Sequence, residues 1–361
     1  MSSVPVFVGL DYHQQSVQVC VLDEAGRVLA NRRVNNDGAA VWAAATRHGQ
    51  PTRVAIEACC GAADLAEELA TQRGLSVALA HPGYVARMKR GPDKTDFADA
   101  RLLADLARVN YLPRVWLAPE ETRQLRRLVR LRQQLVARRR DVKLRITGLL
   151  RENRVRRPEN LSSWTKGWLA WLETQAELSD SDRWILEQHL LELRQLGERI
   201  ASVEKRLSTQ TADDPIVAKL LTLSGVGPVT AITLRAEIGR FDRFGNGKEL
   251  ARFCGITPRN ASTGQKQADA GLVKAGNPQL RALLVELAHR LLNRRDPQWG
   301  PLAGRLLAHG KPKNVVVAAV ANRWTRWLYY QMRSVEPTPT TSAPARQKGP
   351  PLPPSPSLDL T

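Results

Sequence analysis

An apolar run near the N-terminus, VPVFVGLDYHQQSVQVCV at residues 4–21, limits the possible folds of this chain more than any other segment. It contains two β-rich parts, and the first ends at a lone carboxylate, Asp11. This pattern predicts a strand, an acid at its end and a return strand. Carboxylate oxygens at such a position are ligands that Mg²⁺ and Mn²⁺ prefer. One acid does not make a metal site, so partner residues are needed.

The following residues continue with alternating strands and helices. We expect strands at 27–34, 53–56, 75–80 and 114–117, and helices at 39–48, 62–72 and 94–109. Glu57 directly follows the fourth strand, while Asp96 and Asp99 lie three residues apart on the last helix. Residues with this spacing point from one helix face. Residues 1–118 are therefore expected to form an α/β domain.

Acids after the first strand, after the fourth strand and on a late helix resemble the layout of ribonuclease H-like nucleases, and this resemblance implies that the four acids form one metal site. Clustered carboxylates repel one another by about 1–4 kcal/mol per pair, depending on the effective dielectric constant, and a bound cation offsets that repulsion. We therefore predict that Asp11, Glu57, Asp96 and Asp99 hold Mg²⁺ or Mn²⁺. In the alternative interpretation the two helical acids are a solvated face and Glu57 is a strand-end charge. His13 is expected to be a surface residue.

Charge and cysteine content indicate the partner and the compartment. The chain has 54 Lys and Arg against 35 Asp and Glu, and 42 of these cations are arginine. Guanidinium groups match phosphate geometry, so this excess predicts a nucleic-acid partner, with a basic surface kept for solubility or a compositional bias as the alternative. The four cysteines contain no CxxC pair, which disfavours disulfides and structural zinc. No signal segment or long apolar run is evident, so we expect a cytoplasmic protein that does not contact membrane.

The middle of the chain is strongly basic. Residues 120–157 contain 13 Arg and one Lys against four acids, and leucine or valine recurs every seven residues from Leu128 to Leu149. The spacing predicts a long helix over 120–157 that pairs with a second one at 180–208, within the chain or between chains. We assign 119–210 to a helical, coiled-coil region. Its predicted nucleic-acid-binding residues are Arg138, Arg139, Arg140 and Lys143.

Residues 211–335 are expected to form a mostly helical C-terminal domain. Predicted helices at 215–223 and 228–238 are joined by Ser-Gly-Val-Gly, which resembles a helix-hairpin-helix element. Gly225 and Gly227 would let backbone amides approach a phosphate, although a plain interhelical turn is the alternative. Residues 336–361 contain eight prolines and are expected to be a disordered tail without a catalytic role.

Two segments carry a resemblance to a known family. KTDFADA at 94–100, together with the layout of the four acids, resembles ribonuclease H-like DEDD nucleases such as Holliday-junction resolvases. The stretch GITPRNASTGQKQADAGLVKAGNPQLRALLVELA at 255–288 resembles the C-terminal domain of the insertion-sequence one-hundred-and-ten transposases. The order of blocks matches that family over residues 5–330. Departures are Cys59 and Cys60 before Gly61, and Thr263 where a second serine is frequent.

The resemblance implies a DNA recombinase guided by a bridge RNA, with Ser262 as the nucleophile. Arg259, Lys266 and Lys274 would contact nucleic acid near that serine. A metal held by the four acids could activate the hydroxyl, which is weak alone. The family also implies donor and target DNA as partners, a homo-oligomer (dimer or tetramer), and a place at the bacterial nucleoid.

Two other function classes compete with this interpretation. One is a metal-dependent nuclease of the resolvase type, in which water attacks and Ser262 is an ordinary turn residue. The other is a non-enzymatic RNA- or DNA-binding protein. A trapped protein–DNA adduct separates the first from a recombinase, and metal-dependent cleavage excludes the second.

Overall fold

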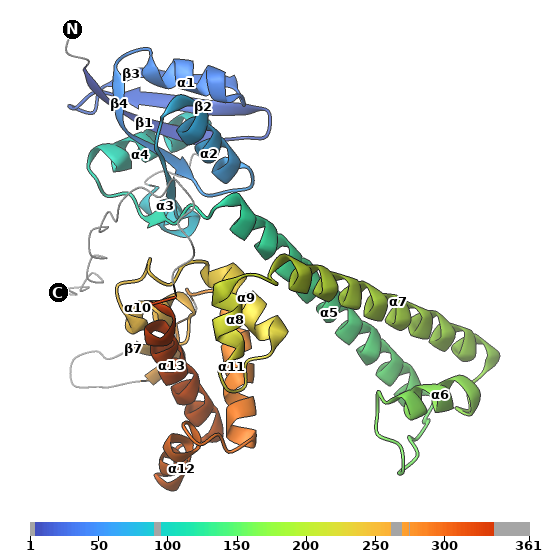
Figure 1. Ribbon diagram of the computed structural model, residues 1–361. Coiled ribbons are helices and arrows are strands. Elements are labelled where there is room, and N and C mark those ends of the chain that lie inside the picture. Colours follow the sequence, from blue (N-terminus) through green and yellow to red (C-terminus); the bar gives the residue numbers. More distant parts are fainter. Residues whose placement is uncertain (1–3, 90–94, 261–268, 274, 336–361) are drawn as a thin grey trace, which may run out of the picture. The chain divides into compact units, whose positions relative to one another are not determined.

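The computed structural model describes residues 4–89, 95–260, 269–273 and 275–335 (Figure 1). Ser262, Lys266 and Lys274 lie outside these residues, as does the tail from 336. The chain divides into two compact units, one ending at Glu120 and the other beginning at Glu121. None of the helices in the described residues is long and apolar enough to cross a membrane.

The first unit contains a six-stranded mixed sheet. Its strands are β1 (Pro5–Tyr12), β2 (Ser16–Leu22), β3 (Val28–Asn35), β4 (Gln50–Glu57), β5 (Val77–Ala80) and β6 (Arg114–Val115). They lie in the order β3-β2-β1-β4-β5-β6. β1 pairs antiparallel with β2 and parallel with β4, which pairs parallel with β5. The centre of the sheet is thus β1 beside β4, and both strands end at the same edge.

Helices cover both faces of this sheet because its central strands are apolar on both sides. α1 (Gly38–Thr46) and α2 (Ala62–Arg73) pack on one face with a valine-rich cluster from β1, β2 and β4. α4 (Asp96–Arg108) packs on the other face, against Phe7, Cys20 and Ala55. The short helix α3 (Pro82–Met88) adds Val85 to the second layer. This α/β unit agrees with the predicted fold class, although the sequence did not predict the seven-residue α3.

The second unit begins with a long helical hairpin. α5 (Glu120–Glu152) and α7 (Asp180–Gln210) run side by side, and α6 (Lys166–Thr174) covers their far end (Figure 1). Leu135 and Val142 of the predicted sevenfold series are buried and Leu149 is partly buried, but the buried positions after Val142 are Ile146 and Leu150. An α-helix has 3.6 residues per turn, so a strict sevenfold spacing drifts around it. The predicted helix to 157 is too long, since α5 ends at Glu152.

The rest of the second unit is a helical domain. It consists of α8 (Pro215–Leu221), α9 (Pro228–Ile238), α10 (Gly247–Phe253), α11 (Pro278–Asn293), α12 (Gly300–Ala308) and α13 (Lys313–Met332), with a two-stranded sheet of β7 (Pro258–Asn260) and β8 (Asp269–Leu272). Its core contains the buried Trp324 and also Leu125 and Val129 of α5. The root of the hairpin is therefore part of this core.

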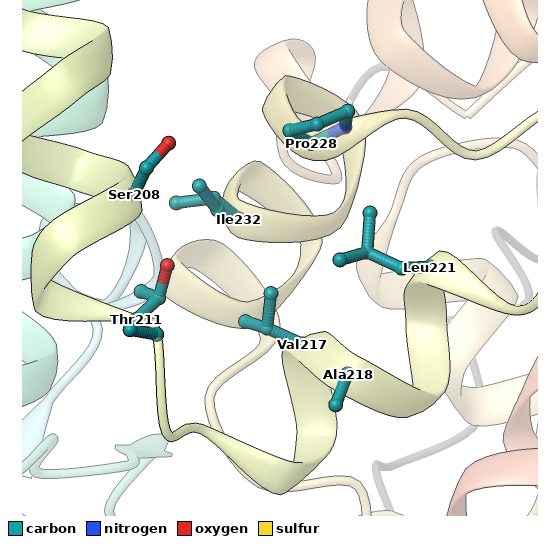
Figure 2. A pocket seen from close by; sticks show the side chains of 8 residues that line it. Ser208, Thr211, Val217, Ala218, Leu221, Pro228 and Ile232 are labelled. Carbon is teal, nitrogen blue, oxygen red and sulfur yellow. The ribbon is translucent and has the colours of Figure 1, made fainter.

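A pocket of about 240 Å³ lies between the end of α7 and helices α8 and α9 (Figure 2). Thr211, Leu221 and Ile232 are among its lining residues, and none of the lining side chains is ionisable. An apolar pocket without acids or bases does not provide a catalytic site. The acids at the sheet edge offer a better candidate.

Candidate active site

Asp11 and Glu57 lie next to each other at the edge of the central sheet. The preceding residues, Leu10 and Ile56, are partners in the parallel pairing of β1 and β4. Side chains alternate between the faces of a strand, so Asp11 points to the same face as Gly9, two residues before it. That face is the one that α4 covers.

Gly9 allows α4 to approach β1 closely. A Cβ atom at this position would lie 2.0 Å from the carbonyl oxygen of Ala100 and 2.4 Å from the amide nitrogen of Ala104, both in the backbone of α4. Only glycine fits such an approach. The contact fixes the first turn of α4, which contains Asp96 and Asp99, beside the end of β1.

His13 lies between two of the candidate acids. Its Nε2 is 3.2 Å from an Asp11 oxygen and 3.2 Å from an Asp96 oxygen, and these three ligand atoms all lie within 4.8 Å of one another. The imidazole is 45% exposed, so it is a surface residue as expected, yet it contacts both acids. Arg33 of β3 pairs with the other oxygen of Asp96. The Arg33 guanidinium offsets part of the negative charge at Asp96.

Asp99 is the most buried of the acids on α4. It is 8% exposed, and its carboxylate lies 2.8 Å from the Lys89 ammonium. Burial raises the pKa of Asp11; the negative charges of Asp99 and Asp96 add to this rise, while His13 opposes it. The three aspartates are thus close enough to repel one another.

Glu57 completes the acidic edge. Burial raises the pKa of the neighbouring Cys59 thiol, and the charges of Glu57 and Asp11 raise it further. Both acids therefore act on one sulfur atom from adjacent strands. The structure brings the four predicted acids to one edge of the sheet, with His13, Arg33 and Lys89 around them.

Two of these neighbours carry no sequence signal. Arg33 pairs with Asp96 across 63 residues, and Lys89 pairs with Asp99 across ten. Neither cation lies at a helical or strand spacing from its acid. Only the packing of α4 on the sheet brings these pairs together.

The predicted serine lies between two strands that the structure does describe. Residues 261–268 connect β7 to β8, and Arg259 is exposed on β7. The base of this segment is held by Val273 donating to Thr257 and by Asn277 donating to Phe253, both at 2.9 Å. A Cβ on Gly276 would lie 2.3 Å from the Cα of Gly255. Residues 255 and 276 therefore touch, and we call the chain between them the serine segment.

The predicted nucleic-acid contacts on α5 differ in their surroundings. Arg138 and Arg140 are exposed, whereas Arg139 is half-buried. The Lys143 ammonium lies 4.6 Å from the ring centroid of Trp164. A cation over an indole face is already engaged. Arg138 and Arg140 are therefore the more accessible of the four.

The glycines of the turn between α8 and α9 have different roles. Gly225 has a φ of 77°, and a Cβ there would lie 2.9 Å from a Leu291 methyl group, so this glycine serves the packing of α11. Gly227 precedes Pro228 at the start of α9, and a Cβ there would meet nothing within 4 Å. Gly227 is the more open of the two.

A buried carboxylate in the second unit was not predicted. Glu237 of α9 is 2% exposed. Both of its oxygens accept from Arg130 of α5, at 3.1 and 3.3 Å, and Asn277 donates to one of them at 2.9 Å. Asn277 also caps α11. This network ties the root of the hairpin to the base of the serine segment.

Two protein-family models match the regions of the chain that contain the acidic edge and the serine segment. Residues 8–154 match a family model of IS110-type DEDD transposases, and residues 217–302 match the transposase IS116/IS110/IS902 family. A probable family 20 transposase of Pseudomonas aeruginosa is 30% identical over 331 residues, which are 89% of this chain and 95% of that protein. This chain belongs to the IS110/IS116/IS902 family of transposases.

Members of the IS110 family are enzymes that recombine DNA. The transposase for insertion sequence element IS1328 of Yersinia enterocolitica is 28% identical over 88% of this chain and 94% of its own length. A pilin gene-inverting protein of Moraxella bovis is 28% identical over 33% of this chain and 37% of its own length. The first family match contains all four acids, and the second contains Ser262.

Proposed function

We propose that this transposase cuts and rejoins the DNA of an insertion sequence with a divalent metal at four acids and Ser262 as the nucleophile. The observation that carries the proposal is the meeting of Asp11, Asp96 and Asp99 at the edge where β1 ends. The strand order, with an antiparallel three-stranded part followed by parallel strands, supports a ribonuclease H-like assignment for this unit.

The side chains at this edge fit Mg²⁺ or Mn²⁺. They offer carboxylate oxygens, which are the hard ligands that these ions prefer. Asp11, Glu57, Asp96 and Asp99 would hold the metal, and its charge would offset the burial and the repulsion that together raise the pKa of Asp11. A bound divalent cation supplies charge stabilisation to a reacting phosphate. Lys89 keeps Asp99 in place beside this site.

Ser262 would act from the segment that β7 and β8 bracket. In covalent catalysis its oxygen forms a bond to phosphorus while the bond to a sugar oxygen breaks, so the phosphodiester energy is retained for rejoining. The contacts at Gly255, Gly276 and Asn277 give this segment a fixed base. Arg259, Lys266 and Lys274 would neutralise the phosphates near the serine.

Nucleic acid would bind beyond the catalytic residues. A guide RNA on Arg138, Arg139 and Arg140 would be held by charge, with Lys143 contributing less because it stacks on Trp164. Gly227 and the start of α9 would receive a DNA phosphate. Donor and target DNA, a dimer or tetramer, and a place at the bacterial nucleoid complete the proposal.

The experiment that tests the nucleophile compares Ser262→Ala with Thr263→Ala. The serine variant should bind DNA normally yet neither cleave nor rejoin it, whereas the threonine variant should remain active. With a nicked target that blocks rejoining, the native protein should form a denaturation-resistant adduct that peptide mapping places on Ser262. Robust cleavage by Ser262→Ala, or an adduct on another residue, overturns the assignment.

A metal-dependent nuclease of the resolvase type is the second candidate. It is favoured by one observation: the acids come together within the first unit alone, from β1, β4 and α4. Such an enzyme would use water and would tolerate the loss of Ser262. Cleavage without an adduct would therefore identify it.

RNA binding is tested separately by charge reversal of Arg138, Arg139 and Arg140 to Glu. Affinity for the copurifying RNA should fall and its salt dependence should weaken, because each neutralised phosphate releases counterions. Thermal stability should change little, since Arg138 and Arg140 are exposed. Equal affinity of both proteins across a salt series would contradict this role.

A further inference from the structure

The far end of the helical hairpin contains an arginine where the backbone favours glycine. α5 ends with Val155 donating to the Leu150 carbonyl at 2.8 Å and Arg154 donating to Arg151 at 3.1 Å. Val155 and Leu150 also pack in one apolar cluster. This is the Schellman arrangement of a helix C-terminus, in which the residue at Arg154 must be left-handed. Its φ is 56°.

At two other helix ends the same arrangement is built with glycine. At Gly255 and Gly310 the same two hydrogen bonds close α10 and α12, with φ values of 70° and 71°. A left-handed backbone is unfavourable for a residue with a Cβ atom. Arg154 therefore lowers stability where it stands. Its side chain is exposed, and within the described part of the chain it has no carboxylate partner.

Arg154 is one of several exposed cations at this end of the hairpin. Residues 151–166 contain five basic and two acidic residues. We call the basic ones the tip cluster; all are exposed, and they are Arg151, Arg154, Arg156, Arg157 and Lys166. Arg157 also donates to the Leu161 carbonyl, which closes the loop after α5. Arg154, Arg156 and Arg157 thus lie on a folded loop, and Arg151 and Lys166 lie at the ends of the helices that it joins.

A second left-handed residue holds an aromatic ring beside this cluster. Trp164 has a φ of 69°, and it packs edge-on against Trp168 with ring centroids 4.6 Å apart. Two of the four non-glycine residues with positive φ in the described chain are therefore at the tip. Unfavourable backbone conformations of this kind concentrate at functional sites. Lys143 and Trp168 contact the Trp164 ring, so the ring holds the loop in place, and the arginines supply the charge that suits a nucleic-acid surface.

We propose that the tip cluster binds the phosphate backbone of a nucleic-acid duplex. Arginine forks bind phosphates without reading the sequence. α5 has 33 residues, so at 1.5 Å per residue the tip lies about 50 Å from the root of the hairpin. Arg140 and Arg151 are eleven residues apart on α5, so the tip cluster lies about 16 Å along the helix from Arg138–Arg140 and makes a separate contact. This surface is independent of the proposed nucleophile and metal.

Replacing Arg154 by glycine separates charge from stability. Glycine removes the left-handed strain, so Arg154→Gly should raise the Tm by roughly 2 °C. The same variant should bind a duplex of about 20 base pairs three- to tenfold more weakly, with a salt slope smaller by about 0.9 for DNA. A gain in stability with a loss in affinity is not expected of a purely structural residue.

Two matched variants control this experiment. Asn110 and Arg295 occupy the same left-handed position at the ends of α4 and α11. Asn110→Gly removes strain without changing charge, and Arg295→Gly removes the same charge elsewhere in the second unit. Neither should weaken duplex binding as Arg154→Gly does.

Binding is measured with the full chain on a DNA duplex and on an RNA duplex of matched sequence. Weaker binding of the Arg154→Gly variant to either duplex supports the proposal, and the responding duplex identifies the partner. Unchanged affinity for both overturns it, as does an equal loss with Arg295→Gly, which would mean that net charge alone matters. A charge reversal of Arg151, Arg154 and Arg156 to Glu should enlarge the loss.

Discussion

Each of the two units places carboxylates beside arginine or lysine, but the balance between acidic and basic groups differs between them. In the sheet unit, three aspartates meet around His13, Arg33 and Lys89, and burial together with their mutual repulsion raises the pKa of Asp11. In the helical unit, Glu237 is 2% exposed and accepts three hydrogen bonds from two partners. The first site has an excess of negative charge, whereas in the second both oxygens of Glu237 accept hydrogen bonds.

This difference separates a site that needs a ligand from one that holds the fold together. A buried carboxylate with every oxygen paired gains nothing from an added cation, and removing it leaves its partners unsatisfied. Clustered acids with too few cations gain from a metal, and removing one of them relieves repulsion. The two sites should therefore respond in opposite directions to substitution and to metal.

The largest effect is expected for the acids of α4. Replacing Asp96 and Asp99 together by Ala should reduce DNA cleavage by at least about 10³-fold, because a bound metal contributes several kcal/mol of charge stabilisation. Circular dichroism should show an unchanged fold. Asp105→Ala is the control, since Asp105 is on the same helix but pairs with Arg108 at 2.7 Å. Undiminished cleavage by the double variant would refute the metal assignment.

The next effect tests how the sheet unit positions those acids. Gly9→Ala forces a Cβ into the backbone of α4, which should lower the free energy of unfolding by about 3 kcal/mol and displace Asp99 from Asp11. Calorimetry should then show weaker Mn²⁺ binding although no acid has changed. Gly148→Ala, in open space on α5, should instead stabilise the protein by about 0.5–1 kcal/mol. Native Mn²⁺ affinity in a folded Gly9→Ala protein would contradict this account.

Glu237 should matter for stability and not for metal. Glu237→Ala leaves Arg130 and Asn277 without their acceptor and should lower the free energy of unfolding by about 2–3 kcal/mol, a value kept small because Arg130 is 52% exposed. Hydrogen exchange should rise at the Asn277 amide, at the base of the serine segment. The control is Glu204→Gln, whose ion pair with Arg132 is half-exposed and should be worth less than about 1 kcal/mol. Equal effects of the two variants would show that burial is not decisive.

The sequence predicted the elements that depend on local pattern. Alternating valines marked β1 and β2, and the three-residue spacing of Asp96 and Asp99 marked one face of α4. The pairs that neutralise these acids could not be predicted, because Arg33 and Asp96 are joined only by the packing of distant elements. Glu237 and Arg130 are separated by 107 residues and gave no signal for the same reason.

Helix ends were predicted less well than helices. The end of α5 was placed five residues too late because Arg154 occupies the left-handed position where glycine would have marked the stop. Gly225 also packs against Leu287 and Leu291 of α11, a contact that the sequence did not predict. A glycine in a turn has the same sequence signal whether it approaches a ligand or another helix.

The smallest expected effect is on the stability difference between Asp11→Asn and the native protein, whose sign should depend on metal and whose size should depend on pH. The pKa of Asp11 is raised from 3.8, so the folded state binds the proton more tightly than the unfolded state. The free energy of unfolding therefore falls as the pH rises from 3.8 through the folded-state pKa, and it stays lower above that pKa. Asp11→Asn should therefore have a higher Tm than the native protein at pH 7 without metal, and this gain should vanish below pH 3.8. Saturating Mn²⁺ should reverse the order, because ligand binding stabilises only the protein that holds it. Glu237→Gln should be less stable than the native protein at pH 7 with or without Mn²⁺. A native protein that is more stable than Asp11→Asn in metal-free buffer at pH 7 would show that the acidic edge, like Glu237, is already satisfied.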